Sequence, residues 1–221
     1  MILPFAARKP IGFKPEAGKT YVLCEGQDEA AVVERISTVN ALSYIPFLRS
    51  ENNNFGDELR QFVKLVPGSR PLALGLVGDK EQAGNYARAE VEKWFSFAEL
   101  PVPAAAGEVS QVVIGGAVLR IGYFLNPAES SSGALEQLFI NQIGEPHRGC
   151  IEEFLSCVST SEFGVSPGEI LLDKVRLRAY LAIKNKGGNT SLRTGLQDGH
   201  LNILSDKFAG LTQFLRDLSG L

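Results

Sequence analysis

The hydrophobic and polar positions of this chain form short apolar runs that alternate with segments of helical spacing. Apolar runs at residues 20–24, 44–48 and 72–77 predict strands, and the third is apolar on both faces, as the central strands of parallel sheets are. After each run, apolar residues recur at every third or fourth position, which predicts a helix, the last of them over residues 85–97. This alternation predicts an α/β core.

The second half of the chain begins with a predicted hairpin and then becomes helical. Residues 112–114 and 118–125 flank Gly115-Gly116, a pattern typical of a β-hairpin. Helical patterns return at residues 134–140 and dominate from about residue 149. We therefore expect a central, mostly parallel sheet with helices on both faces, and a helical C-terminal extension.

The predicted domain organisation is simple. Residues 1–18 contain Pro4, Pro10 and Pro15 and are expected to form an extended N-terminal arm. Residues 19–221 are expected to form one α/β domain, with its C-terminal helices from about residue 149.

Composition excludes several classes of protein. The net charge of −3 gives no bulk attraction to nucleic acid or to an anionic membrane, although a local basic patch is compatible with it. No apolar run approaches the ~20 residues of a transmembrane helix, so no membrane association is expected. Three cysteines in a chain of this size favour reduced thiols and a cytoplasmic location. Cys150 and Cys157 are too far apart for a zinc knuckle.

Acidic residues follow two of the predicted strands. Glu25 comes directly after the first strand, and Asp79 and Glu81 come after the third. Because the carboxyl ends of parallel strands share one edge of a sheet, we expect these three side chains to lie near each other. Glu136 begins the helix that follows the hairpin and is a further candidate.

Carboxylates that converge without matching bases repel each other unless a cation intervenes. Their hard oxygen atoms suit Mg²⁺, or Mn²⁺ in its place. Asp28 and Glu29, by contrast, are interpreted as the cap and a first-turn acid of the first helix. The sequence therefore predicts a divalent-metal site at the carboxyl edge of the sheet.

A strand that ends in Glu25-Gly26, followed by a strand that ends in Asp79-Lys80-Glu81, resembles the Toprim domain, whose motifs are a Glu-Gly and an Asp-x-Asp. The turn Gly133-Ala134-Leu135-Glu136 resembles the further acidic motif of small OLD-like Toprim proteins. The resemblance extends over residues 19–218. Glu81 departs from the motif, because its side chain is one methylene longer than that of aspartate.

The Toprim resemblance implies a three-layer Toprim-like fold and Mg²⁺-dependent hydrolysis of phosphodiester bonds in DNA or RNA. It implies catalytic roles for Glu25 and Asp79, and roles as metal ligands for Glu25, Asp79, Glu81 and Glu136. OLD proteins carry an attached ATPase domain. No Walker pattern occurs here, so the resemblance leaves a separate ATPase open as a partner.

Three lysines are the candidate contacts to nucleic acid. Lys184 and Lys186 lie in a segment rich in glycine and asparagine that is suited to phosphate binding, and Lys174 is the best placed to reach into the acidic site. The alternative is that these side chains only form a solvated helix face.

Two functions therefore remain open from the sequence. One is a metal-dependent nuclease, and the other is a catalytically weak Toprim-fold module that binds nucleic acid or a partner protein. Convergence of Glu25 and Asp79 favours the enzyme. Separation of the two, or salt bridges to Lys80 or Lys174, favours the binding module.

Overall fold

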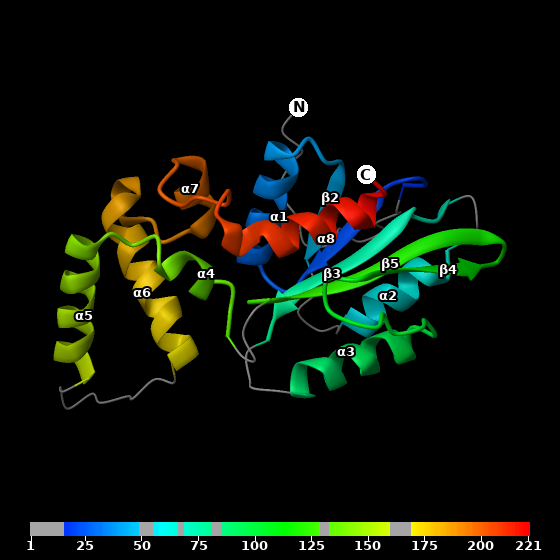
Figure 1. The fold of residues 1–221 in the computed structure, drawn as a ribbon, viewed down its shortest axis with the longest axis horizontal. Coiled ribbons are helices and arrows are strands. Elements are labelled where there is room, and N and C mark those ends of the chain that lie inside the picture. Colours follow the sequence, from blue (N-terminus) through cyan, green and yellow to red (C-terminus); the bar gives the residue numbers. More distant parts are fainter. Residues whose placement is uncertain (1–15, 49–54, 66–68, 81–84, 129–132, 160–168) are drawn as a thin grey trace.

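The computed structural model describes residues 16–48, 55–65, 69–80, 85–128, 133–159 and 169–221. Most of the predicted N-terminal arm, residues 1–15, lies outside the described residues, as does Glu81. The described chain forms a five-stranded sheet with helices on both faces and further helices at its C-terminal end (Figure 1). The predicted α/β class, with a mostly parallel sheet and C-terminal helices, is confirmed.

The sheet has the strand order β2-β1-β3-β5-β4. Its first four strands in this order are parallel, and only β4 is antiparallel to its neighbour β5. The hairpin that joins β4 to β5 turns at Gly115 and Gly116, whose φ angles of 55° and 79° favour glycine. The strands are β1 (Thr20–Cys24), β2 (Tyr44–Leu48), β3 (Ala73–Asp79), β4 (Val109–Ile114) and β5 (Ala117–Asn126).

The helices follow the predicted order, and the C-terminal helices begin earlier in the chain than the pattern indicated. The helical region expected from about residue 149 already begins at Glu145, and its last part consists of a 3₁₀ turn (Asp206–Phe208) and then α8. No helix in the described ranges is long and apolar enough to cross a membrane. The α-helices are α1 (Gln27–Val39), α2 (Phe55–Val63), α3 (Asn85–Phe97), α4 (Gln137–Ile140), α5 (Glu145–Ser159), α6 (Glu169–Lys184), α7 (Leu192–Gln197) and α8 (Ala209–Ser219).

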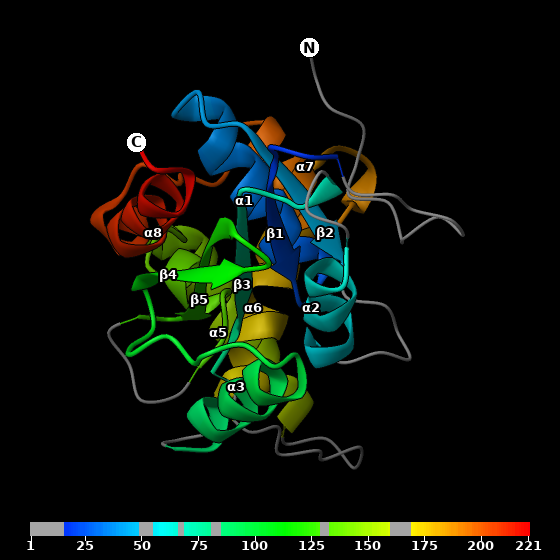
Figure 2. The same cartoon turned by 90° about the vertical axis from the view of Figure 1, so that its right-hand side faces the viewer.

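Two hydrophobic clusters lie on opposite faces of the sheet. One joins sheet residues such as Val22 to α1 and α8, and the other joins residues such as Leu23 to α2 and α3. Side chains alternate between the faces of a strand, so neighbouring residues of β1 enter different clusters. Figure 2 shows α8 and α3 on opposite sides of the β4–β5 hairpin. These are the three layers of the fold.

Two glycines let α8 approach the sheet closely. A Cβ atom at Gly75 of β3 would lie 2.5 Å from the side chain of Leu218, and one at Gly122 of β5 would lie 2.7 Å from the ring of Phe214. Any larger residue would therefore push the helix away from the sheet. Phe214 and Leu218 are both buried in the resulting slot.

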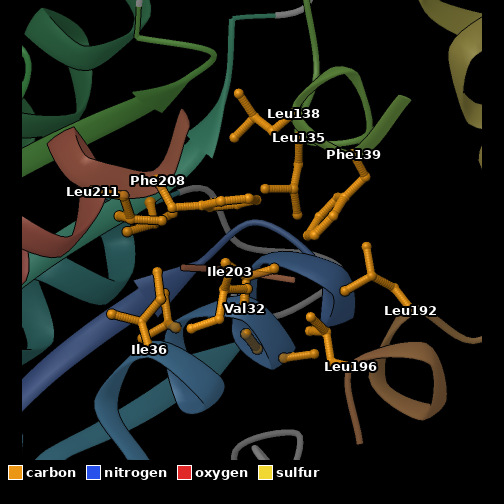
Figure 3. Packing of buried hydrophobic residues seen from close by; sticks show 14 of the residues in the cluster. Val32, Ile36, Leu135, Leu138, Phe139, Leu192, Leu196, Ile203, Phe208 and Leu211 are labelled. Carbon is orange, nitrogen blue, oxygen red and sulfur yellow. The ribbon is translucent and has the colours of Figure 1, made fainter. Parts of the chain in front are cut away.

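The C-terminal helices share the core of α1. Val32 and Ile36 of α1 face residues from the segment around α4, from α7 and from the start of α8 (Figure 3). Since these apolar side chains are buried together, the C-terminal helices form part of the same hydrophobic core as the sheet.

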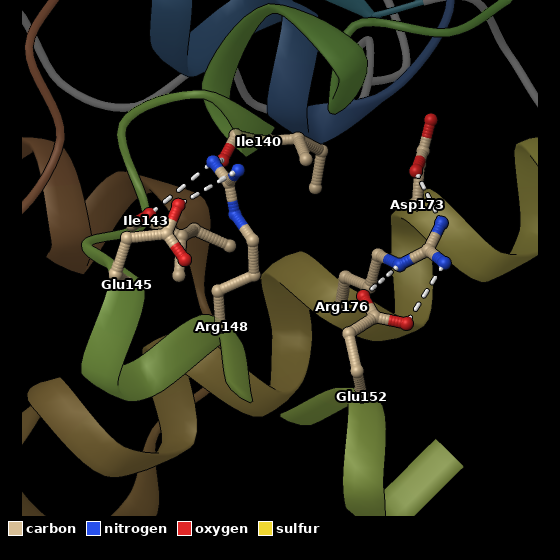
Figure 4. Close-up of polar contacts among 7 residues, drawn as sticks. All are labelled: Ile140, Ile143, Glu145, Arg148, Glu152, Asp173 and Arg176. Carbon is tan, nitrogen blue, oxygen red and sulfur yellow. Dashed lines mark hydrogen bonds and ion pairs between the residues drawn. The ribbon is translucent and has the colours of Figure 1, made fainter. Parts of the chain in front are cut away.

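Helix α6 is fixed in place by α5. Arg176 of α6 forms a bidentate pair with Glu152 of α5, at 2.6 and 3.1 Å, and also donates to Asp173 at 2.9 Å (Figure 4). Arg148 of α5 donates to the carbonyl oxygens of Ile140, the last residue of α4, and of Ile143. Bidentate arginine–carboxylate pairs restrict geometry in two directions. This network holds α6 against α5.

Candidate functional site

The strand order creates a crevice at the carboxyl ends of β1 and β3. The chain leaves β1 toward α1 on one face of the sheet, and it leaves β3 toward α3 on the other. Open α/β sheets place ligands at such a switch point, because the two connections diverge and leave room between them. Glu25 and Asp79 stand at the two strand ends.

The carboxylate of Glu25 contacts the backbone of Asp79 at this sheet edge. The backbone N–H of Asp79 donates to Oε2 of Glu25 at 3.1 Å, and the backbone N–H of Glu25 donates to the carbonyl oxygen of Val77 at 3.0 Å. A Cβ atom at Gly78 would lie 2.9 Å from the same Oε2. The carboxylate of Glu25 therefore lies against the backbone at Gly78, where the side chain of any other residue would collide with it.

Asp79 is held from two further elements. Its Oδ1 accepts a hydrogen bond of 2.8 Å from the backbone N–H of Leu135, and its Oδ2 lies 4.0 Å from Nζ of Lys174. The side chain is only 5% exposed. Burial, followed by the charges of Glu29 and Glu136, raises the pKa of Asp79 to about 9, although Leu135 and Lys174 oppose the rise. Burial therefore favours the protonated form of Asp79, and a cation close to its oxygen atoms favours the ionised form.

Glu29 belongs to this site, which the sequence analysis missed. Glu29 is 7% exposed. A Cβ atom at Gly26 would lie 2.7 Å from Oε2 of Glu29, so the carboxylate occupies space that a side chain at position 26 would need. Burial, and then the charges of Asp28, Glu25 and Glu136, raise the pKa of Glu29 to about 7. The available signal was that the helix has apolar residues directly after Glu29, which indicates that its first turn is buried.

Glu136 is the fourth carboxylate of the site. It stands at the N-cap of α4, is 4% exposed, and its Oε2 is buried without a hydrogen-bond partner. Burial raises the pKa of Glu136, and Asp28 adds to the rise, whereas Lys174 and Arg178 oppose it. Buried acceptors without partners are rare in folded proteins and call for an explanation.

Two cations of α6 face the carboxylates. Lys174 and Arg178 are four residues apart and so lie on one side of the helix. Arg178 forms an ion pair with Asp28 through its Nη2 atom. Its Nη1 atom donates a hydrogen bond of 2.8 Å to the carbonyl oxygen of Thr190. The prediction that Asp28 caps α1 is wrong: Gly26 is the N-cap residue, and Asp28 is turned toward Arg178 instead.

The other predicted contacts lie elsewhere. Nζ of Lys184 lies 5.9 Å from the centre of the Tyr180 ring, and Lys186 is exposed in a short 3₁₀ turn. Neither lines the cavity at the acidic site. Lys80 directs its Nζ to the carbonyl oxygen of Ala128, at 3.0 Å. Of the three lysines assigned to nucleic acid, Lys174 is the one that the structure brings to the carboxylates.

Together these groups line an open cavity of about 510 Å³. One wall is the sheet edge and the start of α1, and the opposite wall is α6 with the loop before α7. The lining consists of residues 25–29, Asp79, Glu136, Lys174, Arg178 and residues 189–191.

The donor chemistry of the site fits a hard divalent cation such as Mg²⁺. Carboxylate oxygens are its preferred protein ligands, and Oε2 of Glu136 is an acceptor with no other partner. Within the described residues, however, no three His, Cys, Asp or Glu side chains are already gathered as a metal site. Asp79 would have to exchange Lys174 for the ion. The predicted ligand Glu81 lies outside the described residues.

The comparisons with known proteins give one match. A family model described as "Protein of unknown function (DUF3226)" matches residues 19–220. No curated protein and no solved structure matches the chain.

Proposed function

Because the chain belongs to the DUF3226 family of proteins of unknown function, we propose a function from its site: metal-dependent hydrolysis of phosphodiester bonds in nucleic acid. One observation carries the proposal. Four carboxylates from three parts of the chain, Glu25, Glu29, Asp79 and Glu136, line one cavity at the switch point of the sheet, and two cations line the same cavity. The resemblance of Glu25-Gly26 and Asp79-Lys80-Glu81 to the Glu-Gly and Asp-x-Asp motifs of the Toprim domain supports the same function.

The carboxylates are the groups that would hold Mg²⁺ or Mn²⁺. Glu25 and Asp79 are adjacent, and Glu136 and Glu29 are close enough to raise the pKa of Asp79 by their charge. A divalent ion at such a site lowers the pKa of a bound water and stabilises negative charge on a leaving oxygen. Gly26 and Gly78 leave the space in which two of these carboxylates lie.

Arg178 is the candidate for binding the substrate phosphate. Its guanidinium lines the cavity, and its partner there, Asp28, is also part of the lining. A planar guanidinium binds phosphate with two parallel hydrogen bonds, and Thr190 fixes its orientation from behind. Lys174 adds a second positive charge one turn away, at the rim of the carboxylates.

The second candidate function is a catalytically weak module that binds nucleic acid or a partner protein. The observation that favours it is that the acids already have cationic neighbours, since Lys174 lies 4.0 Å from Asp79 and Arg178 pairs with Asp28. Such pairs satisfy part of the negative charge without any metal. The two candidates differ in whether a divalent ion takes the place of Lys174 at Asp79.

The decisive experiment measures cleavage and metal binding together. Labelled single- and double-stranded DNA and RNA are incubated with Mg²⁺ or Mn²⁺ and the native protein, Glu25→Gln or Asp79→Asn, and calorimetry measures metal binding to the same proteins. Glu153→Gln, an exposed change on α5, is the matched control.

We expect metal-dependent cleavage by the native protein and the control, and its loss in both site variants. Absence of cleavage together with absence of Mg²⁺ and Mn²⁺ binding would reject the hydrolase. Metal-independent binding of an oligonucleotide in that case would favour the binding module.

A further inference from the structure

The two edges of the sheet differ in how they are protected. The outer strands are β2 and β4. β2 contains Pro46, which lacks an N–H and is a common way of blocking an edge strand from pairing with another chain. β4 has the sequence Val-Ser-Gln-Val-Val-Ile, with neither proline nor charge. It is therefore an edge on which nothing in its own sequence opposes pairing.

The free groups of β4 can be assigned from its register. Ile114 pairs with Ala117 across a two-residue turn, and the pair that flanks such a turn is hydrogen-bonded. Hydrogen-bonded and non-hydrogen-bonded pairs alternate along an antiparallel ladder. The backbone N–H and C=O groups of Val109, Gln111 and Val113 consequently point away from β5.

The same hairpin carries exposed apolar side chains. Val113 is 72% exposed and Val118, its partner on β5, is 55% exposed. Both side chains lie on the face of the sheet that α8 covers. Arg120 is two residues after Val118 on β5, and so on the same face, and it donates to the last carbonyl oxygens of α8. Figure 1 shows the β4–β5 hairpin extending past the helices at the right-hand end of the molecule.

We propose that β4 pairs with β4 of a second copy of this chain, antiparallel and about a two-fold axis at Gln111, to form a continuous ten-stranded sheet. In this register Gln111 faces its own equivalent, and Val109 of each copy faces Val113 of the other. All outward N–H and C=O groups of the strand are then paired. Val113 gains a β-branched neighbour on its own face, a favourable cross-strand pair.

Charge favours a second copy over an unrelated strand. β4 has no charged residue that would meet its own equivalent across the axis. Exposed Glu108, just before β4, comes to lie opposite Ile114 of the other copy, whose carbonyl oxygen accepts a hydrogen bond from Arg70. The carboxylate of Glu108 in one copy therefore approaches the guanidinium of Arg70 in the other, at both ends of the strand pair. This attraction favours the proposed register over registers shifted along the strand.

The helices leave room for this arrangement. α8 lies mainly over β3 and β5, where Gly75 and Gly122 receive it, and it also reaches β4. Strands are ~4.8 Å apart, so the two β5 strands of the dimer, and the two α8 helices above them, would be ~14 Å apart. A helix with its side chains is ~10 Å wide. The two copies of α8 therefore lie on the same face without overlap.

The first test is the mass of the native protein by sedimentation velocity over a range of concentrations, where we expect a reversible dimer. Gln111→Lys places two ammonium groups opposite each other at the axis and should raise the dimer dissociation constant about tenfold or more. Gln197→Lys makes the same change at an exposed position at the end of α7 and should leave the constant unchanged. Circular dichroism checks that both variants are folded.

The second test is a cross-link at the axis. Residues opposite each other in a hydrogen-bonded antiparallel pair have Cα atoms ~5.5 Å apart, within disulfide range. In a background with Cys150→Ser and Cys157→Ser, Gln111→Cys should form a disulfide-linked protein dimer when oxidised glutathione is the oxidant. Val118→Cys in the same background should not. A native monomer at every concentration, an unweakened dimer in Gln111→Lys, or equal cross-linking from both positions would overturn the proposal.

Discussion

Replacing Glu29 with glutamine should make the metal-free protein more stable at high pH but not at low pH. In the folded chain the pKa of Glu29 is raised from 4.5 to about 7 by burial and by Asp28, Glu25 and Glu136. Between these two pH values the unfolded chain has lost the proton while the folded chain still holds it. Stability therefore falls as the pH rises through this window.

The magnitude follows from the size of the shift. One pKa unit corresponds to about 1.4 kcal/mol, so ionisation of Glu29 costs the fold roughly 3 kcal/mol above pH 7. Glutamine has nearly the same shape and cannot ionise, so Glu29→Gln avoids this cost. Part of the raised pKa of Asp79 also comes from Glu29, so the variant should lower that pKa as well.

The assay is urea unfolding at pH 4.5, 6, 7 and 8 in the presence of a chelator. We expect Glu29→Gln to match the native free energy of unfolding at pH 4.5 and to exceed it by roughly 3 kcal/mol at pH 8. Glu153→Gln, which removes an exposed acid from α5, should show no such trend. A stability difference that does not change with pH, or a variant that is less stable at pH 8, would refute the electrostatic account of the site.

Three further outcomes are expected. Gly78→Ala introduces a Cβ atom 2.9 Å from Oε2 of Glu25, so it should lower metal-dependent cleavage about tenfold or more, measured as kcat, with little change in the urea midpoint. Arg178→Ala should raise KM for an oligonucleotide about tenfold without weakening the Mg²⁺ binding measured by calorimetry, because the guanidinium is proposed to bind phosphate and repels a cation. Leu218→Ala removes a fully buried side chain from the slot at Gly75 and should cost about 2–5 kcal/mol in urea unfolding; a smaller loss would mean that α8 moves inward to fill the space.

The sequence predicted the sheet edge well because its signals are local. A run such as residues 20–24 has apolar residues on both faces and ends in a carboxylate, and the same is true of β3 and Asp79. The carboxyl ends of parallel strands share an edge, and because β1 and β3 are neighbours in the sheet, Glu25 and Asp79 come together there. Lys174 was also placed correctly beside the acids.

The errors concern contacts that are distant in the sequence. Asp28 has the composition of a helix cap, but Arg178, 150 residues later, forms an ion pair with it. Glu29 has the position of an ordinary solvated first-turn acid, but it lies in a buried first turn, within the charge field of Asp28, Glu25 and Glu136. Lys184 was selected for a loop-like sequence, although the cavity wall is formed a few residues further on, at 189–191. No local pattern reports which helix will cross a site.

The helix that fills the slot at Gly75 and Gly122 is synthesised after the two strands that form it. A ribosome makes ~5–20 residues per second, and the strands that carry both glycines emerge well before the helix that covers them. Until α8 is made, one face of the nascent sheet presents apolar side chains with a groove along two strands. The acids of β1, α1 and β3 likewise emerge before the cations of α6. Any structure that the nascent chain forms before α6 and α8 emerge therefore lacks both the helix that covers the groove and the cations that face the acids.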